Sequence, residues 1–172
     1  MFLFHLENVE VSNMINLGNE TIHRYKEFIE WTETLRDLDD KIWLTPIAEG
    51  KATVSEIVSH LQYWDSYLIN TIIPAIKNGK GMVFPEFDSF NQKAYEYARS
   101  GISKNSLLDE FKQTRLKLIE ILIAEPDVAI KHVTANGVEN CPHTNTPYSL
   151  LYTIYELIEH DIHHKNQILS VI

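Results

Sequence analysis

The chain has 172 residues, of which 44% are hydrophobic, and this size and composition suit one domain with a substantial core. Its formal net charge of −9 argues against nucleic-acid and anionic-membrane partners, because both require clustered Lys and Arg. The lone Cys141 excludes an intramolecular disulfide framework and suits a reducing cytosol. No apolar stretch has membrane-spanning length, and the first residues lack the basic region of a signal peptide. We therefore expect a single acidic, cytoplasmic domain over residues 1–172.

The spacing of apolar residues predicts long helices in the first half of the chain. The first helix is expected over residues 16–38. A second begins at Thr53, where residues 53–56 have the form of a capping box, and ends before Gly79. Pro74 lies near the end of this helix and is expected to kink its last turn.

An ordered apolar loop is expected next, over residues 79–87. The pattern then predicts a shorter helix over residues 88–99 and a third long helix over residues 103–124. Residues 125–145 are interpreted as an irregular segment that includes a short strand near residues 129–134.

A fourth long helix completes the predicted fold. It is expected to start with Thr146 as N-cap and Pro147 at its first position, and to run nearly to Ile172. Long helices joined by short to medium connections favour an all-α fold. We predict an antiparallel four-helix bundle with an extra short helix and long loops.

Two histidines near the C-terminus suggest a metal site. His160 and His164 are four residues apart, so their imidazoles stand one above the other on one helix face. Such a pair can share one metal ion if a third ligand comes from elsewhere. The zinc-protease pattern H-E-x-x-H is disfavoured, because Asp161 replaces its Glu and few residues follow the pair. The third ligand is therefore expected from an upstream helix.

Helical wheels show where the histidines point. His160 and His164 lie at the edge of the apolar arc of the last helix, whereas His163 falls on its polar face. On the second helix His60 lies at the edge of the apolar arc, and Trp64 would form a wall one turn further on. Taken alone, each histidine is as simply interpreted as a hydrogen-bonded core residue. Together they have the arrangement that a metal site inside a bundle requires.

Other polar residues also have both a functional and a structural interpretation. Cys141 and its neighbour His143 have the types that bind metal, but a free loop thiol is the simpler interpretation. Asp65 and Asp161 fall inside apolar arcs and are expected to be buried. For Asp161, an ion pair with Lys165 and a role behind the metal ligands both remain open. The histidines without a partner at ligand spacing are expected on the surface: His5, His23, His132 and His143.

Two segments resemble signatures of the DinB/YfiT-like family. Residues 53–65, TVSEIVSHLQYWD, resemble its second-helix pattern, roughly S-x-x-E-I-x-x-H-L-x-x-W-D. Residues 160–168, HDIHHKNQI, resemble its terminal H-x-x-H-H-x-x-Q motif. The order and length of the elements agree over the whole chain except residues 1–14. One departure is the pair Lys165-Asn166, where many relatives have Arg-Gly, and it changes no ligand.

The resemblance implies a bundle, commonly dimeric, in which three histidines hold a divalent metal. Carried over residue by residue, the ligands are His60, His160 and His164. Imidazole suits several transition metals, so Zn, Ni and Fe all remain open. A homodimer is also favoured by the apolar surface that Trp31, Trp43 and the loop at residues 82–84 would offer.

Family members include enzymes that transfer low-molecular-weight thiols such as bacillithiol, and a mycothiol-dependent isomerase. Our first hypothesis is therefore a metal-dependent thiol S-transferase acting on a small-molecule substrate. The second is a metal-dependent hydrolase, and the third is a non-catalytic metal- or ligand-binding stress protein. Lys165 near a thiol cosubstrate, or Asp65 as a general base, keeps the first two open.

Overall fold

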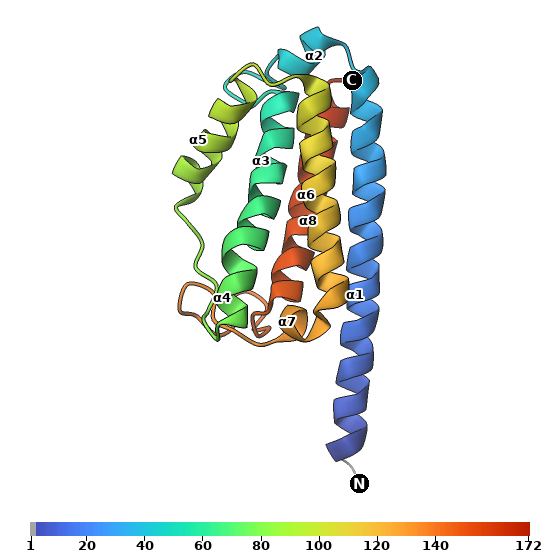
Figure 1. Cartoon of the computed structure of the whole chain (residues 1–172), viewed down its shortest axis with the longest axis vertical. Coiled ribbons are helices and arrows are strands. Elements are labelled where there is room, and N and C mark those ends of the chain that lie inside the picture. Colours follow the sequence, from blue (N-terminus) through green and yellow to red (C-terminus); the bar gives the residue numbers. More distant parts are fainter. Residues whose placement is uncertain (1–2) are drawn as a thin grey trace.

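The computed structural model describes the backbone of residues 3–172 and the side chains of residues 18–172. Within these residues the chain is mostly helical, with isolated backbone bridges in place of strands. The long helices lie side by side and run in opposite directions along one axis (Figure 1). The predicted all-α four-helix bundle is confirmed. Its long helices are α1 (Leu3–Glu33), α3 (Val54–Tyr67), α6 (Lys104–Ala124) and α8 (Leu150–Leu169).

Shorter elements carry the chain between the ends of the bundle. A 3₁₀ turn (Thr34–Asp37) and α2 (Asp40–Leu44) join α1 to α3 at one end. The helix α5 (Phe87–Ala98) returns along the outer side of α3, so that α3 and α6 run parallel (Figure 1). At the other end, α7 (Pro126–Ile130) and residues 131–149 lead from α6 into α8.

The second predicted helix begins as expected and is interrupted before Pro74. Thr53 and Glu56 form the predicted capping box, because each side chain accepts a hydrogen bond from the backbone N–H of the other. A π-helical turn (Leu68–Ile72) then separates α3 from α4 (Ile73–Lys77). Pro74 has no N–H and its ring clashes with the preceding turn, so a regular helical ladder cannot continue through it.

Two predictions for the segment before α8 were wrong. No strand forms at residues 129–134 among the described residues: residues 129 and 130 belong to the short helix α7, and residues 131–134 have no regular structure. The helix α8 is capped by Ser149, whose Oγ accepts a hydrogen bond from the N–H of Tyr152, and not by Thr146. Pro147 lies outside the helix and forms a backbone bridge with Asn140.

Three further differences concern α1, α2 and Trp43. The helix α1 begins at Leu3, upstream of the expected start at residue 16, and α2 was not predicted. Asp39 caps α2 by accepting a hydrogen bond from the N–H of Lys41 at 2.7 Å. Trp43 is only 3% exposed, so it cannot supply the dimer surface expected of it. Of the apolar loop at residues 82–84, which was expected to add to that surface, Val83 is 65% exposed and Met82 is buried.

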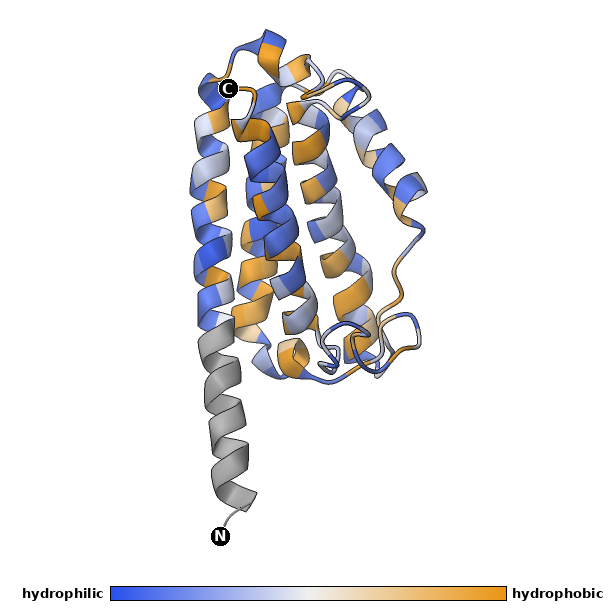
Figure 2. Cartoon of the chain, turned by 180° about the vertical axis from the view of Figure 1, so that it is seen from behind, coloured by the Kyte–Doolittle hydropathy of each residue, from blue (hydrophilic) through white to orange (hydrophobic). Residues whose placement is uncertain are grey.

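The apolar core has two parts. The α7-end cluster and the α2-end cluster lie toward opposite ends of the long helices, and Figure 2 shows apolar residues alternating with polar ones along these helices. The α7-end cluster includes Leu68, Ile72, Leu118, Leu150 and Ile154. The α2-end cluster includes Val54, Ile57, Leu107, Phe111 and Ile168. Three buried charged residues occupy intermediate positions on α3, α6 and α8: Asp65, Arg115 and Asp161.

No helix in the described part of the chain is both long and apolar enough to cross a membrane. This agrees with the hydropathy of the sequence.

Candidate metal centre

Three imidazoles from two helices converge on one point. The Nε2 atom of His160 lies 3.1 Å from Nε2 of His60 and 3.1 Å from Nε2 of His164. The potential ligand atoms of all three residues lie within 4.8 Å of one another. Tetrahedral ligands placed 2.0–2.1 Å from zinc stand about 3.3 Å apart. The spacing therefore fits three nitrogen ligands of a single ion.

The helices explain this convergence. His160 and His164 are one turn apart on α8, with ring centroids separated by 4.4 Å. The ring of His60, on the neighbouring helix α3, lies 5.0 Å from that of His160 and 5.1 Å from that of His164. His163 points outward and is exposed, as the helical wheel indicates. The structure thus brings together the three predicted residues and leaves their neighbour apart.

Burial keeps the three imidazoles neutral. It lowers the pKa of His60 to about 3, and the nearby His160 and His164 act in the same direction. Burial likewise lowers the pKa of His160 to about 4, helped by His163 and Arg115. The pKa of His164 falls to about 4 through burial and the neighbouring His160. At neutral pH all three rings therefore have a lone pair available for a metal.

Hydrogen bonds indicate which nitrogen atoms face the shared point. Nδ1 of His164 lies 2.8 Å from Oε1 of Gln167, which can only accept, so the proton resides on Nδ1. The Nε2 atom then presents a lone pair toward His160. Lone pairs 3.1 Å apart repel one another unless a cation or proton lies between them. Nδ1 of His60 is buried and has no hydrogen-bond partner among the described residues.

Aromatic side chains from α3 and α5 cover His60. Trp64 lies one turn after it, with ring centroids 6.4 Å apart, and Tyr95 approaches to 6.3 Å. The indole N–H of Trp64 donates to Oδ1 of Asn91, and Phe90 packs at 4.5 Å on the indole. His60 is 4% exposed, whereas His160 and His164 are half-buried. The wall formed by α5 was not predicted, because its residues carry no metal-ligand pattern.

Asp65 and Asp161 are buried, as the sequence indicates, but their partner is Arg115 of α6. The guanidinium donates a hydrogen bond from Nε to Asp65 and another from Nη1 to Asp161, and each bond is 2.6 Å long. Burial raises the pKa of Asp65 to about 6, although Arg115 opposes this effect. Of the two roles left open for Asp161, the ion pair with Lys165 does not form among the described residues. Lys165 instead places its Nζ atom 5.2 Å from the ring centre of Trp31.

Arg115 was not identified from the sequence. A signal was present in the sequence, since Arg115 follows Phe111 by four residues and precedes Leu118 by three. These spacings place it on the apolar face of its helix. An arginine on a face that packs into the core requires buried acidic partners.

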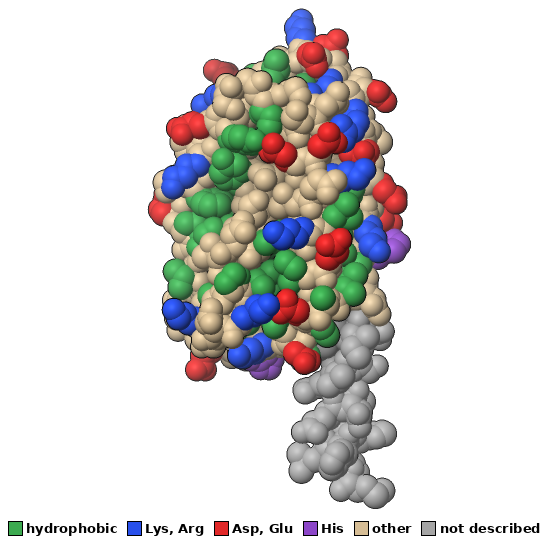
Figure 3. Space-filling model, in the orientation of Figure 1, with side chains coloured by type: hydrophobic (Ala, Val, Ile, Leu, Met, Phe, Trp, Pro, Cys, Tyr) green, Lys and Arg blue, Asp and Glu red, His purple; other side chains and the backbone are tan. Residues whose placement is uncertain are grey.

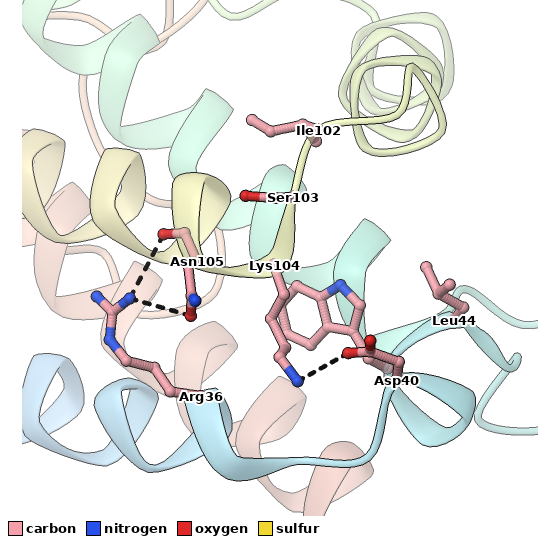
Figure 4. A pocket seen from close by; sticks show the side chains of 8 residues that line it. Arg36, Asp40, Leu44, Ile102, Ser103, Lys104 and Asn105 are labelled. Atoms are coloured by element: carbon pink, nitrogen blue, oxygen red, sulfur yellow. Dashed lines mark hydrogen bonds and ion pairs between the residues drawn. The ribbon is translucent and has the colours of Figure 1, made fainter.

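A cavity of about 470 Å³ lies at the α2 end of the bundle, and none of the three converging histidines lines it (Figure 4). Its charged side chains are already paired. Arg36 donates to Asp109 and to Glu33, and Lys104 contacts Asp40. These contacts tie α6 to the end of α1 and to α2. They explain the cavity as a structural junction, and we assign no chemistry to it.

The remaining histidines and the cysteine lie apart from this centre. His23 pairs with Glu27 at 3.3 Å, and His132 and His143 are exposed, as predicted. His5 lies outside the residues whose side chains are described. Cys141 is buried in its loop, and its backbone N–H donates to the carbonyl of Thr146. Within the described side chains, Cys141 and His143 belong to no group with metal-ligand spacing.

A family model described as the DinB superfamily matches residues 29–168, which include all three converging histidines. The chain belongs to the DinB superfamily. One solved structure similar to this DinB-superfamily chain is YfiT from Bacillus subtilis, described as a probable metal-dependent hydrolase with an unusual four-helix bundle topology. The two chains are 15% identical, with a TM-score of 0.57 over 93% of this chain and 84% of YfiT, which shows a shared fold. A comparison with curated proteins gives no match.

Proposed function

We propose that this chain is a metal-dependent enzyme whose divalent transition metal is held by His60, His160 and His164. The observation that carries the proposal is the distance of 3.1 Å from Nε2 of His160 to Nε2 of His60 and to Nε2 of His164. Zn, Ni and Fe all accept imidazole ligands, so the site suits any of them. Three protein ligands leave at least one coordination position free, which distinguishes catalytic from structural zinc sites.

The proposed reaction is transfer of a low-molecular-weight thiol, of the bacillithiol type, to a small electrophile. When bound, the metal would lower the pKa of such a thiol and make it a nucleophile at neutral pH. This reaction needs no carboxylate base at the centre. Asp65 and Asp161, the two buried aspartates closest in sequence to the ligands, are both committed to Arg115.

The chain's own residues prepare the centre for this chemistry. Gln167 holds a proton on Nδ1 of His164, which directs the Nε2 lone pair toward the ion. Trp64 and Tyr95 shield the His60 side of the centre from water. Half-buried His160 and His164 leave an approach for a small substrate. The aromatic wall favours substrates with an apolar group beside the reacting atom.

A metal-dependent hydrolase is the alternative reaction. The description of YfiT names this activity for that protein, and the shared fold makes it worth testing here. Attack by an activated water is commonly assisted by a free general base. The commitment of Asp65 to Arg115 removes the base that the sequence offered for this role. A non-catalytic metal-binding stress protein would have the same ligands and no turnover.

The metal-loaded protein distinguishes these possibilities in one experiment. It is incubated with bacillithiol or glutathione and a small chloronitroaromatic electrophile, and in parallel with an aryl ester. We expect faster conjugation, in which the thiolate displaces chloride, and a preference for bacillithiol. His60→Ala should lose the effect, and His163→Ala, with its exposed ring, should keep it. Ester hydrolysis with no conjugation would support the hydrolase, and neither reaction would support the binding protein.

The proposed setting is the cytoplasm, where Cys141 stays a thiol and small thiols are abundant. The net charge of −9 disfavours nucleic acid and anionic membranes as partners. On the face shown in Figure 3, acidic and basic side chains alternate without a large patch of one sign. A small-molecule substrate and a second copy of the chain are the partners that we propose.

A further inference from the structure

All four bundle helices meet at the side chain of Arg115. This residue, on α6, is 1% exposed. Its guanidinium donates hydrogen bonds of 2.6 Å to Asp65 on α3 and to Asp161 on α8. Tyr25 of α1 packs against the same guanidinium, with the ring centre 4.0 Å from its central carbon. The buried charges therefore connect helices that otherwise contact one another through apolar side chains.

Each carboxylate is carried by a helix that also carries a metal-ligand histidine. Asp161 directly follows His160 on α8, and Asp65 follows His60 by five residues on α3. The two helices that carry the ligands are thus the two helices that Arg115 joins. No ligand comes from α6 itself, so Arg115 acts on the centre from a third helix.

Direct packing between the two ligand-carrying helices, α3 and α8, is limited. The helix α3 packs closely on α6 and α5, whereas its contact with α8 is slight. The three imidazoles lie at this slight α3–α8 contact. Close packing of apolar side chains therefore does little to fix the distance between His60 and His160. A guanidinium bound to both helices supplies a fixed link in its place.

The energetics also call for a role beyond stability. Burying three charged groups costs desolvation free energy, and apolar residues of similar volume often stabilise a core as well or better. Arg115 satisfies the two carboxylates with donors that point in fixed directions from one planar group. Such a group specifies a distance and an orientation, which apolar packing does less sharply.

We propose that Arg115 is a positioning residue that holds His60 at ligand distance from His160 and His164, acting through Asp65 and Asp161. This inference rests on the proposed metal centre and names Arg115 as the residue that sets the distance between its ligands. Loss of the link should loosen the centre while the bundle remains folded.

Cobalt(II) provides the test, because its visible absorption reports the number and geometry of its ligands. Affinity is measured by competition with a chromogenic chelator, and folding by circular dichroism. The variants are Arg115→Met, Arg115→Lys and the neutral triple variant Arg115→Met/Asp65→Asn/Asp161→Asn. The triple variant leaves no uncompensated buried charge, so it keeps the test valid if Arg115→Met does not fold. The control is Leu118→Ala, which removes a fully buried side chain one turn along α6 without touching the ion pairs.

We expect Arg115→Met and the triple variant to bind cobalt about tenfold or more weakly, with an altered visible spectrum. Arg115→Lys keeps the positive charge, so it should bind cobalt more tightly than Arg115→Met and less tightly than the wild type. Leu118→Ala should lower the unfolding temperature and keep the wild-type spectrum. A folded triple variant with wild-type affinity and spectrum would overturn the positioning role alone. A wild-type protein that binds no cobalt would overturn the metal centre itself, and with it this inference.

Discussion

Nδ1 of His164 donates a hydrogen bond of 2.8 Å to Oε1 of Gln167, one turn further along α8. The bond fixes both the tautomer and the orientation of the ring. Metal-bound histidines commonly have such a partner on the second ring nitrogen, and its loss weakens metal binding. The terminal glutamine of the sequence motif thus has a physical role in the structure.

Replacing this glutamine tests that role. Gln167→Ala should lower metal affinity by about 10- to 100-fold without unfolding the protein, because the ring of His164 loses its fixed tautomer. Asn166→Ala, at an exposed neighbouring position, serves as the control. Affinity is measured by chelator competition. Equal affinities for the two variants would show that packing alone orients His164.

The histidine ligands should differ sharply from their neighbour. His60→Ala, His160→Ala and His164→Ala should each abolish or greatly weaken metal binding, since each removes one of three protein ligands. His163→Ala should retain the metal, because its ring is exposed and points away from the other three. Metal content after dialysis against a weak chelator is the measurement. Loss of metal from His163→Ala together with retention in His164→Ala would contradict the helix orientation.

The lowered pKa values predict how the metal-free protein responds to acid. The pKa values of the three imidazoles are about 3 to 4 when folded, against about 6.5 in the unfolded chain. Between these limits the unfolded chain binds more protons, so the free energy of unfolding falls as pH drops from about 6.5 toward 4. Thermal unfolding at about pH 7.5 and about pH 5 measures the loss.

His60→Gln provides the control for this pH effect, because glutamine does not titrate in this range. Its unfolding temperature should fall less between the two pH values than that of the wild type. An identical fall in both proteins would assign the acid response to other groups.

The metal itself should stay bound at about pH 5.5, because the lowered pKa values keep the three ligand imidazoles neutral at a pH where free imidazole is already largely protonated.

A homodimer remains a prediction for the free protein. Val83 is 65% exposed and Phe87 is 57% exposed, and apolar side chains gather along the α3 and α5 side in Figure 3. Light scattering at micromolar concentration should give about twice the 20.0 kDa chain mass. Val83→Asp should shift the mass toward the monomer, whereas Ile123→Asp, on exposed α6 surface, should not. A monomeric wild-type protein would exclude the dimer.

The sequence was sufficient for the features that depend on helical periodicity. The long helices, and the positions of His60, His160 and His164 at the edges of the apolar faces of their helices, follow from spacing within single helices. The start of α8 does not, because residues 146 and 147 resemble a helix start in isolation. Backbone hydrogen bonds with distant residues keep this segment extended: the carbonyl of Tyr148 accepts from the N–H of Val133, and its N–H donates to the carbonyl of Glu139. Local sequence contains no information on those partners.

Arg115 shows a second limit of sequence reasoning. Its position on an apolar face was readable, but its two partners come from helices 46 and 50 residues away along the chain. Periodicity indicates which face of a helix is buried, and it does not indicate which residues of other helices stand opposite. For the same reason the sequence did not predict that Tyr95 packs beside His60 or that Asn91 accepts a hydrogen bond from Trp64, both from α5.

Asp65, Arg115 and Asp161 form a charged layer between the α2-end and α7-end clusters, and this layer affects how the core responds to apolar substitutions. Substitutions add independently when their sites share no partners, and residues on opposite sides of this layer belong to separate apolar clusters. Phe111 and Ile72, one in each cluster, should therefore show no coupling in a double-mutant cycle. Apolar side chains of either cluster that do not contact Arg115 should therefore exchange without compensating changes in the other cluster.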